Sequence, residues 1–202
     1  MAPVEAYTGR GNRRGAMRLR CFVAVPLEGE VHGSAVGFLR RLAALAPAVK
    51  WVEPENLHFT LKFLGEVEEG RLEKVKAALG QALAGKAAFG LELCGAGAFP
   101  NLRRPRVVWL GAGAGRDRLG ELAEAVESAL APLGFPREAR AFSPHLTLGR
   151  ARQPGAAGAL AAELEAAGSR PWGELKVDRV VLMQSTLTPR GPIYTPLAVF
   201  RL

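Results

Sequence analysis

Apolar and polar residues alternate without interruption from Leu57 to Phe63, which is the pattern of a β-strand with one buried face. The apolar face is predicted to pack in the core and consists of Leu57, Phe59, Leu61 and Phe63. The opposite face carries His58, Thr60 and Lys62. Such a strand can line a cleft with its polar side.

Similar reasoning along the chain predicts an alternation of strands and helices. Further strands are predicted at 18–26, 50–52, 89–98, 106–111, 141–149, 174–185 and 193–200. Apolar residues recurring every three or four positions predict amphipathic helices at 31–45, 72–83 and 119–133, and an alanine-rich segment predicts a fourth at 155–168. The loop 188–192 is expected to form a hairpin or flap.

The tetrapeptide His58-Phe-Thr60-Leu returns as His145-Leu-Thr147-Leu, and these motifs contain two of the three histidines of the chain. Each motif places an imidazole and a hydroxyl on one strand face, roughly 6.5 Å apart at two strand rises. The motifs are 145 − 58 = 87 residues apart, and a similar order of elements surrounds each one. We therefore predict a duplicated α+β unit whose two lobes face each other across a cleft.

Composition favours a globular protein with an anionic partner. The chain has 202 residues, of which 49% are hydrophobic and 23% charged, with a net charge of +8. A basic surface favours nucleic acid or phosphate esters. Residues 1–16 are polar and without periodicity, so we expect a flexible basic tail, or alternatively an RNA-contacting arm, followed by one bilobal domain over 17–202.

Several other classes of protein are disfavoured. Cys21 and Cys94 lie in apolar strand-like runs and are expected to be reduced thiols, which fits a cytoplasmic protein. No apolar run approaches the roughly 20 residues that a membrane span needs. The glycines of 111–115 precede Arg116, where a dinucleotide-binding fingerprint needs glycine or alanine. His32 is expected to be a surface residue near a helix start.

Two histidines on facing strands can supply one acid and one base for displacement at phosphorus. Thr60 and Thr147 could donate hydrogen bonds to the non-bridging oxygens. Such a site needs no metal, and no pattern of further zinc ligands accompanies the histidines. A catalytically silent RNA- or nucleotide-binding module remains an alternative at this point.

The segments NLHFTLKFLG and SPHLTLGR, with the opening RCFVAVPL strand and the closing Gly191-Pro-Ile-Tyr194 stretch, resemble the 2H phosphoesterase superfamily. The most similar branch contains the RNA 2′,3′-cyclic phosphodiesterases, also called 2′-5′ RNA ligases. The resemblance covers about residues 17–202. It implies a bilobal α+β fold in which two antiparallel sheets face a central cleft and helices lie outside.

The resemblance also implies metal-independent opening of RNA 2′,3′-cyclic phosphate ends to 2′-phosphomonoesters, without a cofactor, and joining of tRNA halves by the reverse reaction. His58 would be the general acid and His145 the base, and Thr60 and Thr147 would bind phosphate. We expect a monomer. A related 2H enzyme acting on a small cyclic nucleotide is the remaining alternative. Further candidates follow from position alone: Lys62, Arg150 and Arg152 for phosphate, and Tyr194 and Phe63 for stacking on a base.

Overall fold

The structure is a computed structural model, and it describes residues 17–151, 157–189 and 191–202. The expected basic tail over 1–16 and the candidate Arg152 lie outside the described residues. Within the described part, the strands are β1 (Arg18–Pro26), β2 (Val49–Trp51), β3 (His58–Glu68), β4 (Phe89–Phe99), β5 (Val107–Ala112), β6 (His145–Ala151), β7 (Pro171–Val177), β8 (Arg179–Leu187) and β9 (Pro192–Arg201). The helices are α1 (Glu30–Leu45), α2 (Leu72–Leu83), α3 (Arg116–Leu130) and α4 (Ala157–Ala166).

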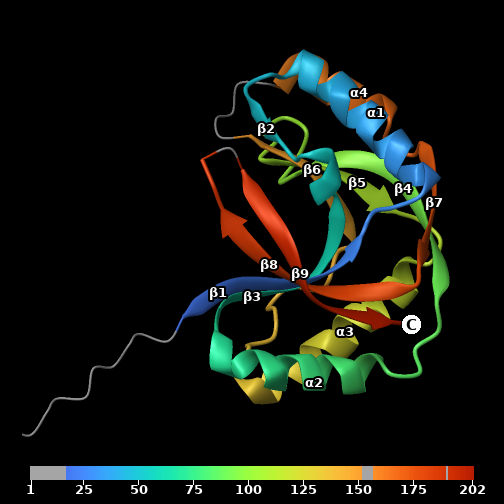
Figure 1. Cartoon of the computed structure of the whole chain (residues 1–202). Coiled ribbons are helices and arrows are strands. Elements are labelled where there is room, and N and C mark those ends of the chain that lie inside the picture. The colour runs from blue at the N-terminus through green and yellow to red at the C-terminus, as the bar shows by residue number, and fades with distance from the viewer. Residues whose placement is uncertain (1–16, 152–156, 190) are drawn as a thin grey trace, which may run out of the picture.

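The described strands pair antiparallel in the order β7-β4-β5-β6-β3-β1-β8-β9, with β2 beside β6. This order divides into a β3 half (β3, β1, β8 and β9) and a β6 half (β6, β5, β4, β7 and β2). Helices α2 and α3 cover the β3 half, and α1 and α4 cover the β6 half (Figure 1). The expected bilobal α+β arrangement with outer helices is confirmed.

The halves meet at the strands that carry the two motifs. A single register pair, Phe59 with Leu146, joins β3 to β6, and both side chains are fully buried. Because the two strands pair at only this point in the register, they separate on either side of it. The two predicted sheets therefore form one continuous sheet, which is joined through this pair of residues. The polar faces of the two motifs come together at the junction.

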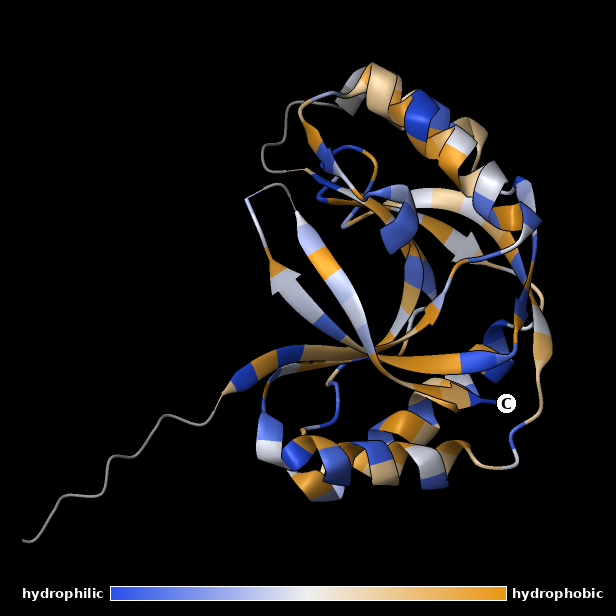
Figure 2. Ribbon diagram, viewed as in Figure 1, coloured by the Kyte–Doolittle hydropathy of each residue, from blue (hydrophilic) through white to orange (hydrophobic). Residues whose placement is uncertain are grey.

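Burial follows the amphipathic pattern read from the sequence. Each helix turns at least one leucine fully into the core: Leu42, Leu79, Leu130 and Leu160. The central strands are predominantly apolar, whereas the helices carry both apolar and polar stretches (Figure 2). One boundary prediction is wrong, because the strand expected over 174–185 is interrupted at Asp178. The break separates β7, at one edge of the sheet, from β8 in the other half.

Two β-bulges change which side chains face the cleft. Leu61 has no partner on β1, since Val23 pairs with Lys62 and Ala24 pairs with Thr60. Leu148 likewise has no partner on β5, because the register passes from Thr147 to Gly149. An extra residue reverses the inward and outward alternation that follows it. Both bulges fall on the leucine that closes a His-x-Thr-Leu motif, so the duplication extends to this irregularity.

The bulge at Leu61 overturns two predictions made from strict alternation. Phe63 was predicted to lie in the core, but 55% of it is exposed. Lys62 was predicted on the polar face, but only 2% of it is exposed, and its ammonium group bonds the carboxylate of Glu127 at 2.7 Å. The equivalent of Lys62 in the second motif is Gly149. A Cβ there would lie 2.7 Å from the indole of Trp51, so the space is already filled.

Candidate active site

Both motif histidines stand at the first residue of a strand and are held in the same way. The Nδ1 of His58 lies 2.7 Å from the carbonyl oxygen of Asn56, and the Nδ1 of His145 lies 2.7 Å from that of Ser143. A carbonyl oxygen can only accept, so each Nδ1 carries a proton and donates. The acid–base chemistry of each ring is thereby left to Nε2.

The pairing of Phe59 with Leu146 sets the two motifs against each other. Extending this antiparallel register by one residue each way places His58 opposite Thr147 and His145 opposite Thr60. Each imidazole therefore has one threonine hydroxyl opposite it on the other motif strand and one on its own strand. On its own strand, the Oγ1 of Thr60 lies 3.0 Å from the Nε2 of His58.

The electrostatic environment of His58 disfavours its protonated form. Burial is the largest cause of its lowered pKa, and the positive charges of Arg150 and His145 add to the effect. The hydrogen bond to the Asn56 carbonyl opposes the shift only in part. Arg150 and His145 belong to β6, so this electrostatic effect acts across the junction of the two halves.

Aromatic rings pack against both histidines. The His58 ring packs against Phe22 at 4.9 Å between centroids and edge-on to Tyr194 at 5.4 Å. His145 meets Phe99 edge-on at 5.2 Å. Burial raises the pKa of Tyr194, while the charges of Arg150 and Arg20 oppose this shift. The rings limit how each imidazole can rotate and offer flat apolar surfaces next to the acid–base groups.

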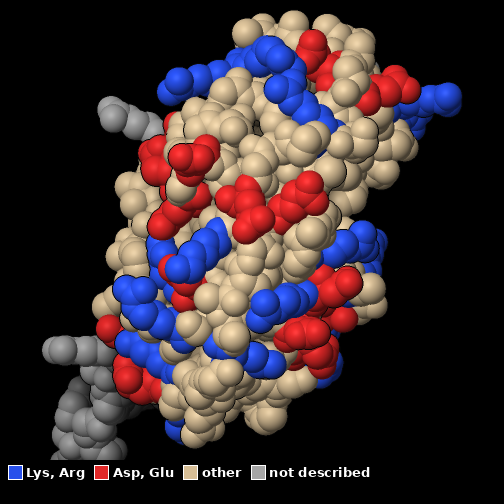
Figure 3. All heavy atoms as spheres, turned by 90° about the vertical axis from the view of Figure 1, so that its right-hand side faces the viewer, with Lys and Arg blue, Asp and Glu red and all other residues tan. Residues whose placement is uncertain are grey.

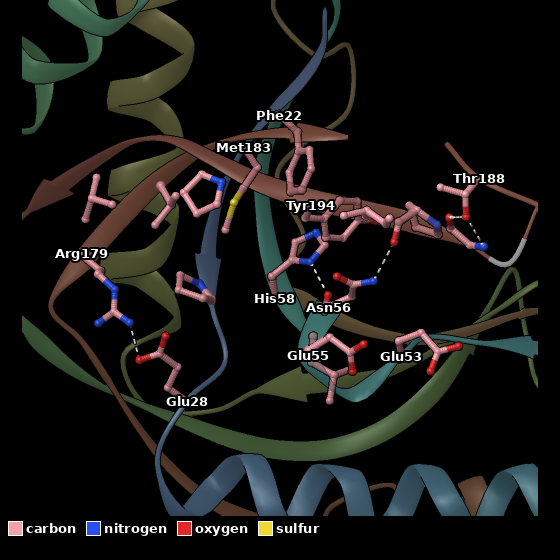
Figure 4. A pocket seen from close by; sticks show the side chains of 18 residues that line it. Phe22, Glu28, Glu53, Glu55, Asn56, His58, Arg179, Met183, Thr188 and Tyr194 are labelled. Carbon is pink, nitrogen blue, oxygen red and sulfur yellow. Dashed lines mark hydrogen bonds and ion pairs between the residues drawn. The ribbon is translucent and has the colours of Figure 1, made fainter. Parts of the chain in front are cut away.

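A cavity of about 710 Å³ opens beside His58, on the side of β8 and β9. Its apolar wall includes Phe22, Met183 and Tyr194, and its rim includes Glu53 and Glu55 (Figure 4). At one end, Glu28 forms an ion pair with Arg179. His145 is not among the residues that line this cavity, so the space lies to one side of the paired motifs.

Asn56 is a site residue that is not among the candidates predicted from the sequence. Its carbonyl orients His58, and its amide nitrogen donates to the carbonyl oxygen of Pro192 at 3.0 Å. It therefore connects the His58 loop to the start of β9, where Tyr194 lies (Figure 4). The sequence does contain one indication of this role, because Asn56 and Ser143 each lie two residues before a motif histidine.

The structure brings most of the predicted site residues together. His58, Thr60, His145 and Thr147 lie around the junction of β3 and β6. The bulge at Leu148 puts Arg150 on the same sheet face as Thr147, and Phe63 follows the equivalent bulge after Thr60. Lys62 is excluded from this group, since Glu127 and the carbonyl oxygen of Pro136 accept bonds from its ammonium group.

The described residues also bear on metal binding and on membrane insertion. Within the described residues, no three or more His, Cys, Asp or Glu side chains are grouped so that they could hold a metal ion. None of the helices in that part of the chain combines the length and the apolar character needed to cross a membrane.

Comparison with known proteins identifies the family. The family model of the 2′-5′ RNA ligase superfamily matches residues 32–188. The chain belongs to this superfamily. It is 39% identical to an RNA 2′,3′-cyclic phosphodiesterase of Methanothermobacter thermautotrophicus, over 92% of this chain and all of that protein. It is 40% identical to the protein of the same name in Archaeoglobus fulgidus, over 90% of this chain and 99% of the other.

Solved structures of the superfamily share the fold. A protein of Thermus thermophilus superposes with a TM-score of 0.77 at 33% identity, covering 92% of this chain and 98% of the other. LigT of E. coli in complex with 3′-AMP superposes with a TM-score of 0.76 at 28% identity, covering 92% and 99%. Membership of the superfamily thus agrees with the fold expected from the two His-x-Thr motifs.

Proposed function

We propose that this protein hydrolyses RNA 2′,3′-cyclic phosphate ends to 2′-phosphomonoesters, using His58 and His145 as an acid–base pair. The observation that carries the proposal is the matched setting of the two histidines. Each donates from Nδ1 to a carbonyl two residues earlier and leaves Nε2 for chemistry, and the single β3–β6 pair sets the two motifs across from each other. The names of the curated relatives support the substrate class.

In the proposed reaction, water attacks phosphorus in line with the bond to the 3′ oxygen. One Nε2 removes a proton from the water, and the other gives a proton to the 3′ oxygen as its bond to phosphorus breaks. Thr60 and Thr147 donate to the non-bridging oxygens as negative charge develops there. The product keeps the phosphate on the 2′ oxygen.

The resemblance to the superfamily implies His58 as the acid and His145 as the base. The lowered pKa of His58 favours its neutral form in the ligand-free protein. A bound cyclic phosphate carries negative charge, which stabilises a protonated imidazole and restores the acid form. A 5′-hydroxyl can take the place of water as the nucleophile. The same base then removes its proton, and the same acid protonates the leaving 3′ oxygen, which corresponds to 2′-5′ ligation of RNA such as tRNA halves.

Binding of the terminal nucleoside is assigned to the aromatic wall. Tyr194 and Phe22 stand beside His58, and Phe63 is exposed on the same strand after the bulge. Base stacking on such rings tolerates any base. The positive charge of Arg150, which acts on His58, makes the cleft attractive to anionic RNA. We propose a monomeric cytoplasmic protein that needs no metal.

The test is hydrolysis of an oligoribonucleotide ending in a 2′,3′-cyclic phosphate, followed from pH 5 to 9 with EDTA present. We expect a bell-shaped profile and losses of about 10²- to 10⁴-fold in His58→Ala and in His145→Ala. A 2′-phosphate product establishes the branch of the superfamily. Oligonucleotide binding without turnover at any pH would instead support the binding-module alternative, and turnover confined to free cyclic nucleotides would support the small-molecule alternative.

A further inference from the structure

Lys50 and Arg150 face each other across the pairing of β2 with β6. The register places Lys50 opposite Arg150, with Val49 and Trp51 opposite Ala151 and Gly149. Directly opposed residues of an antiparallel pair project from the same face, and like charges so placed repel each other. Both side chains are exposed. The fold therefore holds two cations side by side at a cost in stability, unless an anion lies between them.

Some other cations of the described residues have carboxylate partners. Arg41 pairs with Glu163, and Arg179 pairs with both Glu28 and Asp178. On the face shown in Figure 3, basic and acidic side chains are interspersed. In contrast, no carboxylate of the described residues lies within 4.0 Å of Lys50 or Arg150. The segment 152–156 that follows β6 contains no acidic residue either.

The position of this pair relative to the motifs is fixed by the sheet. Strand β3 pairs with β6 at Leu146 and then separates from it, and β2 takes the free edge of β6 from Gly149 onward. Lys50 thus stands at the fork where the two halves part. Arg150 shares the sheet face of Thr147, and its charge acts on both His58 and Tyr194 in the other half. The pair therefore borders the proposed site.

We propose that Lys50, together with Arg150, binds the RNA phosphodiester on the 5′ side of the terminal nucleotide. This inference rests on the proposed function. Thr147 and Arg150 are three residues apart on β6, roughly 7–10 Å allowing for the bulge, about the length of one extended nucleotide. With the cyclic phosphate between the motifs, the next phosphate would reach the two cations. Its negative charge would relieve their repulsion and add a salt-sensitive contribution to affinity.

The experiment compares two substrates in each variant: a nucleoside 2′,3′-cyclic phosphate, which lacks the second phosphate, and an oligoribonucleotide ending in the same cyclic nucleotide. The quantity measured is the ratio of kcat/KM for the oligonucleotide to that for the mononucleotide. We expect Lys50→Ala to lower this ratio on the order of 5- to 10-fold, independent of sequence, and Lys50→Arg to restore it. The slope of log kcat/KM against log salt should fall by about 0.7 for the oligonucleotide alone.

Lys176→Ala is the matched control, because Lys176 is an exposed lysine on β7, at the far edge of the β6 half. An unchanged ratio in Lys50→Ala, an equal loss on both substrates, or the same effect in Lys176→Ala would overturn the inference. If the wild type turns over neither substrate, the proposed function fails, and the salt dependence of oligonucleotide binding in Lys50→Ala still decides the phosphate contact.

Discussion

Phe59 and Leu146 form the one register pair that joins β3 to β6, and both are completely buried between the motif histidines. Each lies next to a histidine in sequence but points away from it, into the core. The relative position of the two catalytic candidates therefore depends on apolar packing beneath them, more than on any polar contact between them.

Phe59→Ala should lower the free energy of unfolding by about 3–5 kcal/mol, because it removes a fully buried ring from this junction. Urea unfolding measures the change. Phe63→Ala is the matched control, since the same truncation at a residue that is 55% exposed should change stability by less than about 1 kcal/mol. Equal losses in the two variants would contradict the assignment of the bulge at Leu61.

Lys62→Met should be destabilising through a different mechanism. It leaves the carboxylate of Glu127 buried without its partner, which typically costs about 3–5 kcal/mol. Adding Glu127→Gln should recover part of the loss, as measured by unfolding of both single variants and the double variant. Under conditions in which Lys62→Met is still folded, its KM for the cyclic phosphate substrate should stay within a few-fold of the wild-type KM. A large rise in KM would instead indicate that Lys62 binds the phosphate of the substrate.

Arg150→Gln should raise the pKa of His58, because the variant removes a positive charge that disfavours the imidazolium. Titration of the His58 ring by NMR gives the pKa directly, without depending on turnover. Lys176→Gln removes a distant charge and serves as the control. An unchanged His58 pKa in Arg150→Gln would mean that the guanidinium lies too far from the ring to act in the site.

Stability should fall as the pH is lowered from about 6.5, the usual histidine pKa, toward the lowered pKa of folded His58. In this window the unfolded chain binds a proton that the folded state does not, so protons favour unfolding. Above about pH 6.5 both states are neutral at this position, and the effect vanishes. Unfolding free energies at pH 7.5 and 5.5 should differ more in the wild type than in His58→Asn. The same difference in both proteins would place the pH dependence elsewhere.

Tyr194→Ala should raise KM for a nucleoside 2′,3′-cyclic phosphate by about 5- to 100-fold, the usual effect of losing one stacking ring. Tyr194→Phe keeps the ring against His58 and Phe22 and should stay close to wild type. If the phenylalanine variant fails as badly as the alanine variant, the hydroxyl rather than the ring is what the substrate needs.

Local pattern was sufficient for much of this fold. The bounds of β1 and α2 agree with those read from alternation and helical spacing, and the repeated His-x-Thr-Leu motif located both histidines. The alternation of apolar and polar residues gave wrong predictions where the geometry of a strand depends on the strands paired with it. The bulge at Leu61 exists only in the pairing of β3 with β1, so no property of β3 alone shows that Lys62 turns inward and Phe63 outward.

The same limit applies to the site. The sequence does not show which face of the sheet the side chains after Thr147 occupy. The bulge at Leu148 places Arg150 on the cleft face. The role of Asn56 depends on Pro192, which is distant in sequence and adjacent only in the folded chain. Likewise, the predicted strand is interrupted at Asp178 because β7 and β8 belong to different halves of the sheet. A continuous apolar run in the sequence does not reveal this.

That break has a consequence for how the molecule is held together. After Asp178 the chain leaves the β6 half. Strand β8 pairs with β1 and β9 pairs with β8, so the two ends of the described chain lie in one half. Neither half is a contiguous stretch of sequence that could be excised as a folding unit. Truncation at Asp178 would remove β8 and β9 from the β3 half and leave one edge of β1 unpaired, so the truncated chain should lose its cooperative unfolding transition.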